Sequence, residues 1–140
     1  MLTRKQVERS LRRLLSHGLL DALPKREEDR RMLYALGAWR IHEAGADQEP
    51  AINTELEQWL GKFCFAVNVD HVTFRREMVD AGFIGRSDDG SRYWINDQQV
   101  HRTVAADALD VDPGDVMVDE TAAREERKRR YLQPSNRGGA

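Results

Sequence analysis

The segment VDHVTFRREMVDAGFIGRSDDGSRYWI, residues 69–95, limits the possible folds of this chain more than any other stretch. It begins with Asp70, a residue type that caps helices, and continues with apolar residues at helical spacing. Gly82 follows at a position where a helix commonly ends. Two short apolar runs then flank DDG. Because Gly90 can adopt the positive φ of a tight turn, the pattern predicts a β-hairpin after the helix.

Three helices are predicted in and before this segment. The first has Pro24 in its first turn and buries Met32, Leu33, Leu36 and Trp39. The second is capped by Asn53 or Thr54 and buries Leu56, Trp59, Leu60 and Phe63. The third, residues 71–81, buries His71, Phe74 and Met78. A short turn joins the second to the third, in helix-turn-helix order. The sequence therefore predicts a mainly α (α+β) winged helix-turn-helix domain over residues 22–96, a three-helix core with a C-terminal β-hairpin wing.

Residues 1–21 are predicted as an N-terminal amphipathic helix, helical over 3–17. Thr3 and Gln6 have the spacing of a capping box. One face carries Val7, Leu11, Leu14 and Leu15, and the other is rich in arginine. The leucine stripe packs either on the core or on a partner, and the basic face is either solvated or in contact with phosphate.

Charge is segregated beyond the predicted domain. Residues 97–119 are predicted as an acidic linker, since no Lys or Arg occurs from 103 to 120. Residues 120–132 are predicted as a basic C-terminal helix and 133–140 as a disordered tail. Such segregation either steers a partner, folds back on the domain or belongs to a solvated tail.

Three strings carry a family resemblance: LPKREEDRRMLYAL, INTELEQWLGKF and DHVTFRREMVDAGFIGRSDDGSRYW. Over about residues 23–94 the chain resembles an uncharacterised bacterial winged-helix-like family, found alone or appended to transcriptional regulators. The most specific part is Asp70, His71, Thr73, Arg75 and Arg76, followed by V-D-x-G and G-S-x-Y. The resemblance implies a small regulatory or DNA-binding-like domain. It leaves the N-terminal helix and the tail after residue 96 unexplained.

The candidate nucleic-acid surface is the outer face of helix 71–81 together with the wing at 83–95. Its residues are Thr73, Arg75, Arg76, Arg86, Ser91 and Arg92. The acids Glu77, Asp80, Asp88 and Asp89 offset its four arginines, and the whole chain has a net charge of −2. Because DNA affinity depends largely on phosphate neutralisation, binding is expected to be weak or to require a dimer. Pairing of Arg76 with Asp80, four residues apart, is the structural alternative.

Two functions remain open from the sequence. The first is a transcriptional regulator that binds duplex DNA. The second is a non-enzymatic protein–protein interaction module of winged-helix shape without direct DNA contact, acting through a homodimer or a protein partner at helix 3–17. RNA binding through Arg92 and Tyr93 is less favoured.

Enzyme, metal and cofactor chemistry find little support in the sequence. The histidines His17, His42, His71 and His101 lack metal-ligand spacing, and no glycine-rich phosphate loop is present. Cys64 lies between two phenylalanines and is expected to be a buried, inert thiol. Trp39, Trp59 and Trp94 are expected to anchor the core. Short apolar runs and a single cysteine favour a cytoplasmic protein without a membrane partner.

Overall fold

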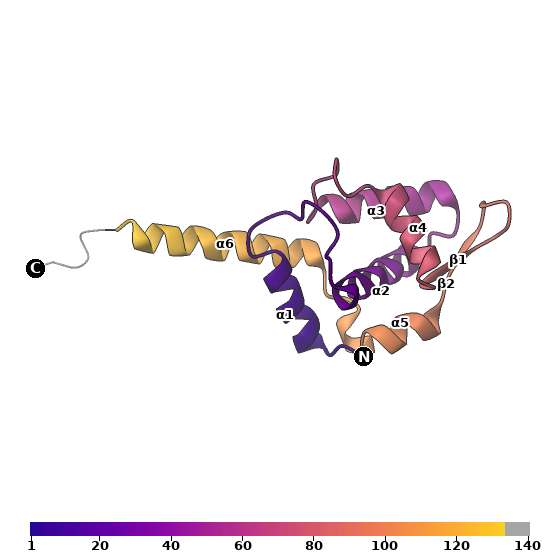
Figure 1. Ribbon diagram of the computed structural model, residues 1–140, viewed down its shortest axis with the longest axis horizontal. Coiled ribbons are helices and arrows are strands. Elements are labelled where there is room, and N and C mark those ends of the chain that lie inside the picture. The colour runs from indigo at the N-terminus through magenta and orange to yellow at the C-terminus, as the bar shows by residue number, and fades with distance from the viewer. Residues whose placement is uncertain (134–140) are drawn as a thin grey trace, which may run out of the picture.

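A computed structural model describes residues 1–133 and shows a mainly helical chain with a small antiparallel sheet (Figure 1). This is the α+β class that the sequence predicts. In chain order the elements are α1 (Arg4–Leu14), α2 (Glu27–Ala44), α3 (Glu49–Gly61), α4 (His71–Asp80), β1 (Ile84–Arg86), β2 (Tyr93–Ile95), α5 (Asp97–Thr103), the 3-10 helix η1 (Ala106–Ala108) and α6 (Pro113–Tyr131).

Helix α2 is the centre of the fold. All seven residues from Met32 to Ala38 are buried, as expected of a helix that is covered on several sides. It contacts α3, α5 and β2. Gly37 permits the close approach, because a Cβ atom there would lie 3.1 Å from Phe74 and 3.2 Å from Trp59. The core is therefore built around Gly37, where α2 approaches side chains of both α3 and α4.

The apolar faces predicted for α3 and α4 are confirmed. Phe74 and Met78 are fully buried, as are the four predicted residues of α3 and the turn after it. Asp70 caps α4, accepting a hydrogen bond of 2.9 Å from the backbone N–H of Thr73. His71, expected to be buried, is only half-buried, and its Nδ1 lies 3.9 Å from Glu57.

Two predicted helix starts differ from the structure. Helix α2 begins at Glu27, three residues after Pro24, and α3 begins at Glu49, ahead of the predicted caps Asn53 and Thr54. Pro50 lies in the first turn of α3, where its missing N–H has no intrahelical partner to lose. A proline in the first turn of a helix is therefore found at Pro50 in α3, and its prediction is wrong for Pro24, which precedes α2.

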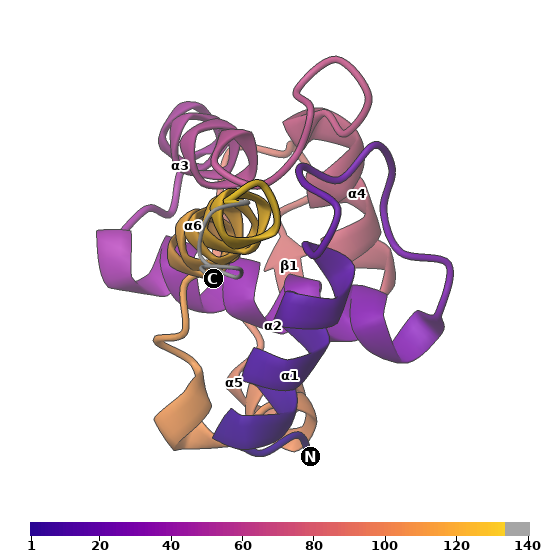
Figure 2. The same cartoon turned by 90° about the vertical axis from the view of Figure 1, so that its left-hand side faces the viewer.

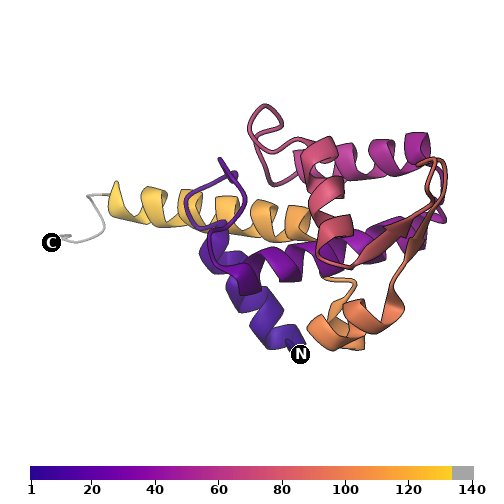
Figure 3. The same ribbon diagram turned by 45° about the vertical axis from the view of Figure 1, so that its right-hand side comes forward.

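The predicted hairpin forms between β1 and β2, with Ile84 opposite Ile95 and Arg86 opposite Tyr93. It lies beside α4 and α2 (Figure 3). The connection between α2 and α3 also pairs with β2: the Tyr93 N–H donates to the Asp47 carbonyl at 2.9 Å. The expectation that Trp94 anchors the core is wrong, because its side chain is 55% exposed and covers Gly85 on the outer face.

Helix α1 packs on the domain through the stripe that the sequence identified. The capping box of Thr3 and Gln6 is present, and Val7, Leu11 and Leu15 are fully buried. The stripe faces η1 and α6 (Figure 2). The sequence left open whether this stripe packs on the core or on a partner, and the structure shows that it packs on the core of its own chain.

Residues 97–119, predicted as an acidic linker, are ordered and form α5, η1 and the start of α6. Helix α6 begins at Pro113 rather than at residue 120, with Asp112 as its N-cap. Apolar side chains explain the difference: Val100, Val104, Ala108, Leu109 and Val111 are buried. The backbone of Leu2 also pairs with Thr103 and Ala105 at 2.9 and 2.8 Å. Of the predicted disordered tail, residues 134–140 lie outside the described residues.

In the described part of the chain, no helix has the length and apolar character needed to cross a bilayer.

Candidate functional site

The surface predicted to contact nucleic acid contains a hollow of about 250 Å³ between α4 and the hairpin. It is lined by Arg75, Arg76, Val79, Asp80, Arg86 and Tyr93. Three of the six predicted site residues, all arginines, therefore meet at one place. The other three, Thr73, Ser91 and Arg92, do not line it.

Arg75 is not available to a ligand, and we remove it from the predicted contact set. Its side chain is 9% exposed, and its guanidinium lies 3.0 Å from the carboxylate of Glu49. It also donates to the Asn53 side chain and lies 5.8 Å from the ring centre of Tyr93. Arg75 thus joins α3, α4 and β2, and its charge is neutralised inside the domain.

Arg76 and Arg86 are exposed, and neither forms an ion pair within residues 1–133. The alternative pairing of Arg76 with Asp80 is not formed. Arg86 extends over the turn of the hairpin, where a Cβ atom at Gly90 would lie 3.2 Å from its Cζ. These two guanidinium groups, one from the helix and one from β1, are the uncommitted cations of the hollow.

The hydroxyl groups of the predicted site are engaged in local structure. Thr73 donates to Asp70 at 2.9 Å. At the hairpin turn, Asp89 accepts from the Ser91 N–H at 3.0 Å and from the hydroxyls of Ser87 and Ser91 at 2.7 and 2.8 Å. These hydrogen bonds, the backbone one first, lower the pKa of Asp89 to about 2. Arg92 pairs with Asp47 at 2.9 Å on the surface. Thr73, Ser91 and Arg92 therefore stabilise the start of α4, the hairpin turn and the connection to Asp47, which surround the hollow.

Two of the four acids in this region are also engaged. Asp89 holds the turn, and Glu77 accepts a hydrogen bond of 2.8 Å from the hydroxyl of Tyr34. Burial and this contact raise the pKa of Tyr34, which keeps it a donor. No local pattern indicates the contact of Tyr34 with Glu77, since the two residues are 43 positions apart. Asp80, which lines the hollow, and Asp88 in the hairpin turn form no ion pair among residues 1–133, so the local charge is close to balanced.

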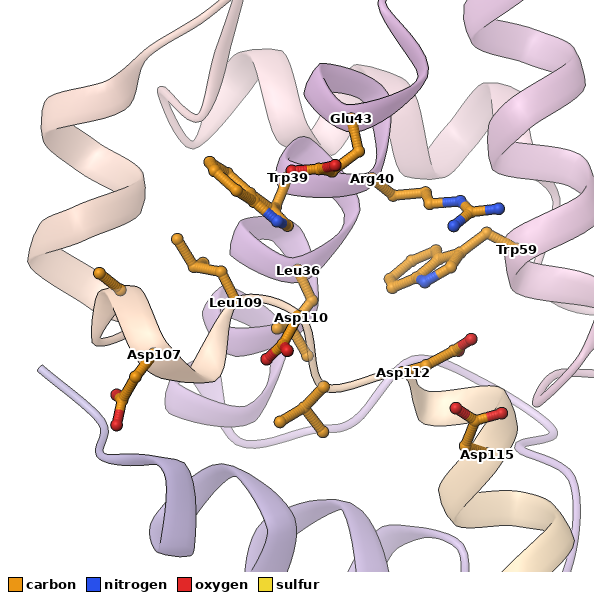
Figure 4. Close-up of a pocket in the computed structure, with 12 residues that line it drawn as sticks. Leu36, Trp39, Arg40, Glu43, Trp59, Asp107, Leu109, Asp110, Asp112 and Asp115 are labelled. Atoms are coloured by element: carbon orange, nitrogen blue, oxygen red, sulfur yellow. The ribbon is translucent and has the colours of Figure 1, made fainter.

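A second, larger cavity of about 670 Å³ lies between α2, α3 and the η1–α6 connection (Figure 4). Leu36, Trp39, Trp59 and Leu109 form its apolar wall, and Asp107, Asp110, Asp112 and Asp115 form an acidic rim. Arg40 lines the cavity too, but its Nε lies 3.6 Å from Glu55. Sequence reasoning missed this cavity because it assigned the aspartates to a linker. Asp112 followed by Pro113 was the local signal for a helix start there, since these residues are the N-cap and the first residue of α6.

Neither hollow has the character of a metal or nucleophile site. Among the described residues, no three His, Cys, Asp or Glu side chains are grouped to hold a metal ion. Cys64 is buried as predicted, and burial raises the pKa of its thiol to about 12. At neutral pH the thiol is therefore protonated and weakly reactive.

Fold and site together define a mainly helical α+β protein with an arginine-lined hollow between a helix and a hairpin. The model of a family described as "Uncharacterized protein conserved in bacteria (DUF2087)" matches residues 19–95, more than half of the chain. The chain belongs to this DUF2087 family. The match includes α2, α3, α4 and both strands, so the arginine-lined hollow lies inside the family domain. No curated protein and no solved structure matches the chain.

Proposed function

We propose that this chain is a non-enzymatic winged-helix regulator of the bacterial cytoplasm that binds duplex DNA through α4 and the hairpin, weakly as a monomer. The order of three helices followed by a hairpin supports the winged-helix assignment. So does the pairing of the α2–α3 connection with β2, because it adds a third extended segment beside the wing. In this arrangement α4 is the recognition helix.

The observation that carries the proposal is the convergence of Arg76 and Arg86. Both are exposed, both lack an ion pair within the described residues, and both line one hollow between the recognition helix and the wing. Guanidinium groups on two neighbouring elements suit contacts to backbone phosphates. The buried contacts of Arg75 fix the orientation of α4 against α3, so the two free arginines are presented from a rigid surface.

Weak affinity follows from the same geometry. Each phosphate that the protein neutralises contributes about 0.9 to the slope of log K against log salt concentration. Two free arginines therefore correspond to a slope of about −2 per chain. Asp80 and Asp88 next to the hollow reduce the affinity further, because they repel phosphate.

Fluorescence polarisation with a random-sequence duplex at low salt tests the proposal. The wild-type chain is expected to bind, and the double variant Arg76→Ala/Arg86→Ala is expected to lose most of the binding. The matched control is Arg9→Ala/Arg26→Ala, which removes two exposed arginines that lie away from the hollow. No binding by the wild type at about tens of micromolar, inside the usual range of about 1–100 μM for non-specific complexes at physiological salt, would contradict the proposal.

The second candidate function is recognition of a basic protein segment without DNA contact, and the cavity in Figure 4 favours it. An apolar wall with two tryptophans beside Asp107 and Asp115, which form no ion pair among residues 1–133, suits an arginine or lysine side chain with its apolar stem. A polarisation assay with an arginine-rich peptide, compared with an acidic peptide of equal length, separates this function from the first. Binding that is lost in Asp107→Asn/Asp115→Asn and retained in Arg76→Ala/Arg86→Ala would favour the protein partner.

A further inference from the structure

Helix α6 has an open face along its whole length. It contains 19 residues, so it is about 28 Å long at 1.5 Å per residue. Its N-terminal part packs on α1, and its C-terminal part extends beyond the rest of the molecule (Figures 1 and 3). The exposed stripe has three- and four-residue spacing and consists of Asp115, Val118, Ala122, Glu125, Arg129 and Leu132.

Charge on this helix is divided into two halves of opposite sign. Residues 113–123 contain three acids and no base, whereas residues 124–132 contain five bases and two acids. In the acidic half, Asp115 and Asp119 form no ion pair among residues 1–133, and in the basic half the same is true of Arg127 and Lys128. The two halves lie on one straight helix, so they cannot neutralise each other within a single chain.

The helix macrodipole accounts for part of this pattern, since acids near the N-terminus and bases near the C-terminus stabilise any helix. It does not account for the apolar residues of the open stripe. Val118 is 67% exposed and Leu132 is 62% exposed, and Tyr131 beside the stripe is 88% exposed. Large apolar side chains at both ends of a charge-divided face are characteristic of a helix that packs against another helix.

We infer that α6 forms a homodimer by packing antiparallel against α6 of a second copy. The charge pattern selects both the partner and the direction. In an antiparallel pair with two-fold symmetry, each acidic half lies beside a basic half, and the contact occurs twice. In a parallel pair like charges would meet.

The residue pairs of this dimer follow from its symmetry. With the two-fold axis near residue 123, Asp119 lies beside Lys128 of the partner copy and Val118 lies beside Arg129, whose methylene stem covers it. Asp115, on the rim of the acidic cavity, approaches the partner's end of α6. All the residues of this dimer surface lie on α6, whereas the hollow at Arg76 and Arg86 lies between α4 and the hairpin. The inference therefore holds whether or not the chain binds DNA.

Sedimentation equilibrium of the full chain tests the dimer. We expect a reversible dimer at about 50 mM salt whose dissociation constant rises about tenfold at about 500 mM, because exposed charges are screened. Two charge-reversal variants, Asp115→Lys/Asp119→Lys and Arg127→Glu/Arg129→Glu, are each expected to weaken self-association at least tenfold. An equal mixture of the two variants is expected to restore the dimer, because each half of α6 in one variant then lies beside a half of opposite charge in the other.

The matched control is Asp80→Lys/Asp88→Lys, which makes the same charge change at two exposed residues of α4 and the hairpin turn, away from α6, and should leave the dimer unchanged (Figure 1). Far-UV circular dichroism of each variant shows whether α6 remains helical, and restoration in the mixture excludes unfolding as the cause. A wild-type chain that stays monomeric at low salt would overturn the inference. So would a dimer that resists both reversals, or a mixture that fails to associate.

Discussion

Helices α1 and α6 both lie outside the family domain, and both combine apolar residues with a cluster of arginines, but the fold uses them differently. Val7, Leu11 and Leu15 of the α1 stripe are fully buried. Two arginines of the helix contact the same chain: Arg4 lies 2.7 Å from Asp110 and Arg13 lies 2.8 Å from Asp29. The C-terminal half of α6 has no comparable contacts with the body of the molecule. The sequence left both cases open: the stripe of helix 3–17 could pack on the core or on a partner, and the charge-segregated C-terminal region could steer a partner, fold back or remain solvated.

The difference shows that amphipathicity identifies a face that packs, but not the element that it packs against. Helix α1 packs against η1 and α6, two elements that the sequence did not predict as its neighbours. In α6 the N-terminal apolar residues Pro113 and Met117 are buried, and those further along have nothing to cover them. The surface available to a partner is therefore decided by the length of α6.

The largest effect that tests this comparison is expected from Leu11→Ala. Leu11 is 1% exposed within its own chain, so the substitution should lower the free energy of unfolding by about 3 kcal/mol, as for other buried leucines. Urea denaturation measures the change, and Val118→Ala on the exposed stripe of α6 is the control, expected within about 0.5 kcal/mol of wild type. Equal effects at the two sites would erase the distinction between the helices.

Arg13→Ala is expected to have the next largest effect. Its guanidinium makes two hydrogen bonds, at 2.8 and 3.0 Å, to Asp29, which is only 4% exposed. Removal leaves a buried carboxylate without this partner and should destabilise the chain by about 1–2 kcal/mol, since Arg13 itself is half-exposed. Chemical denaturation of Arg13→Ala beside Arg9→Ala, an exposed arginine of the same helix, measures it. Identical midpoints would mean that the basic face of α1 is merely solvated.

Val118→Lys is expected to change association and leave the stability of the fold almost unchanged. The added charge lies on an exposed face, so the free energy of unfolding should shift by no more than about 0.5 kcal/mol. The dimer should weaken about tenfold, because the added positive charge lies beside Arg129 of the partner copy in the proposed contact. Sedimentation and denaturation of the same sample separate the two effects. Unaltered association would place any dimer contact away from this stripe.

Acid is expected to loosen the hairpin turn before it unfolds the core. The folded-state pKa of Asp89 is about 2, below its ordinary value of 3.8, so its stabilising contribution is present above pH 4 and is lost as the pH falls toward 2. Amide exchange at Ser91 across that range, in wild type and Asp89→Asn, follows the turn. An Asp89→Asn variant with the same acid response as wild type would assign the loosening to other carboxylates.

The sequence predicted what depends on neighbours in the chain. The capping box at Thr3, the Asp70 cap, the inward direction of Phe74 and Met78 and the turn at Gly90 all follow from spacing over a few residues, and all are present. Such features are set by local backbone hydrogen bonding and helix periodicity.

What the sequence did not predict depends on distant partners. Arg75 and Arg76 are adjacent and chemically identical, yet only Arg75 faces Glu49, 26 positions earlier on α3. The exposure of Trp94 was within reach, because strand alternation places it opposite to Tyr93 and Ile95. The acids of 97–119 are likewise interspersed with buried valines and leucines. These apolar residues indicate a packed segment and not a solvated linker.

The salt dependence of duplex binding tests the central claim, that Arg76 and Arg86 form the functional surface, most directly. Binding constants of wild type and Arg76→Ala/Arg86→Ala are measured over a series of salt concentrations, with the chain kept monomeric by Arg127→Glu/Arg129→Glu in both. The account predicts that the slope of log K against log salt falls from about −2 to near zero in the double variant. A slope of unchanged steepness would show that the phosphate contacts, and with them the function, lie elsewhere on the molecule.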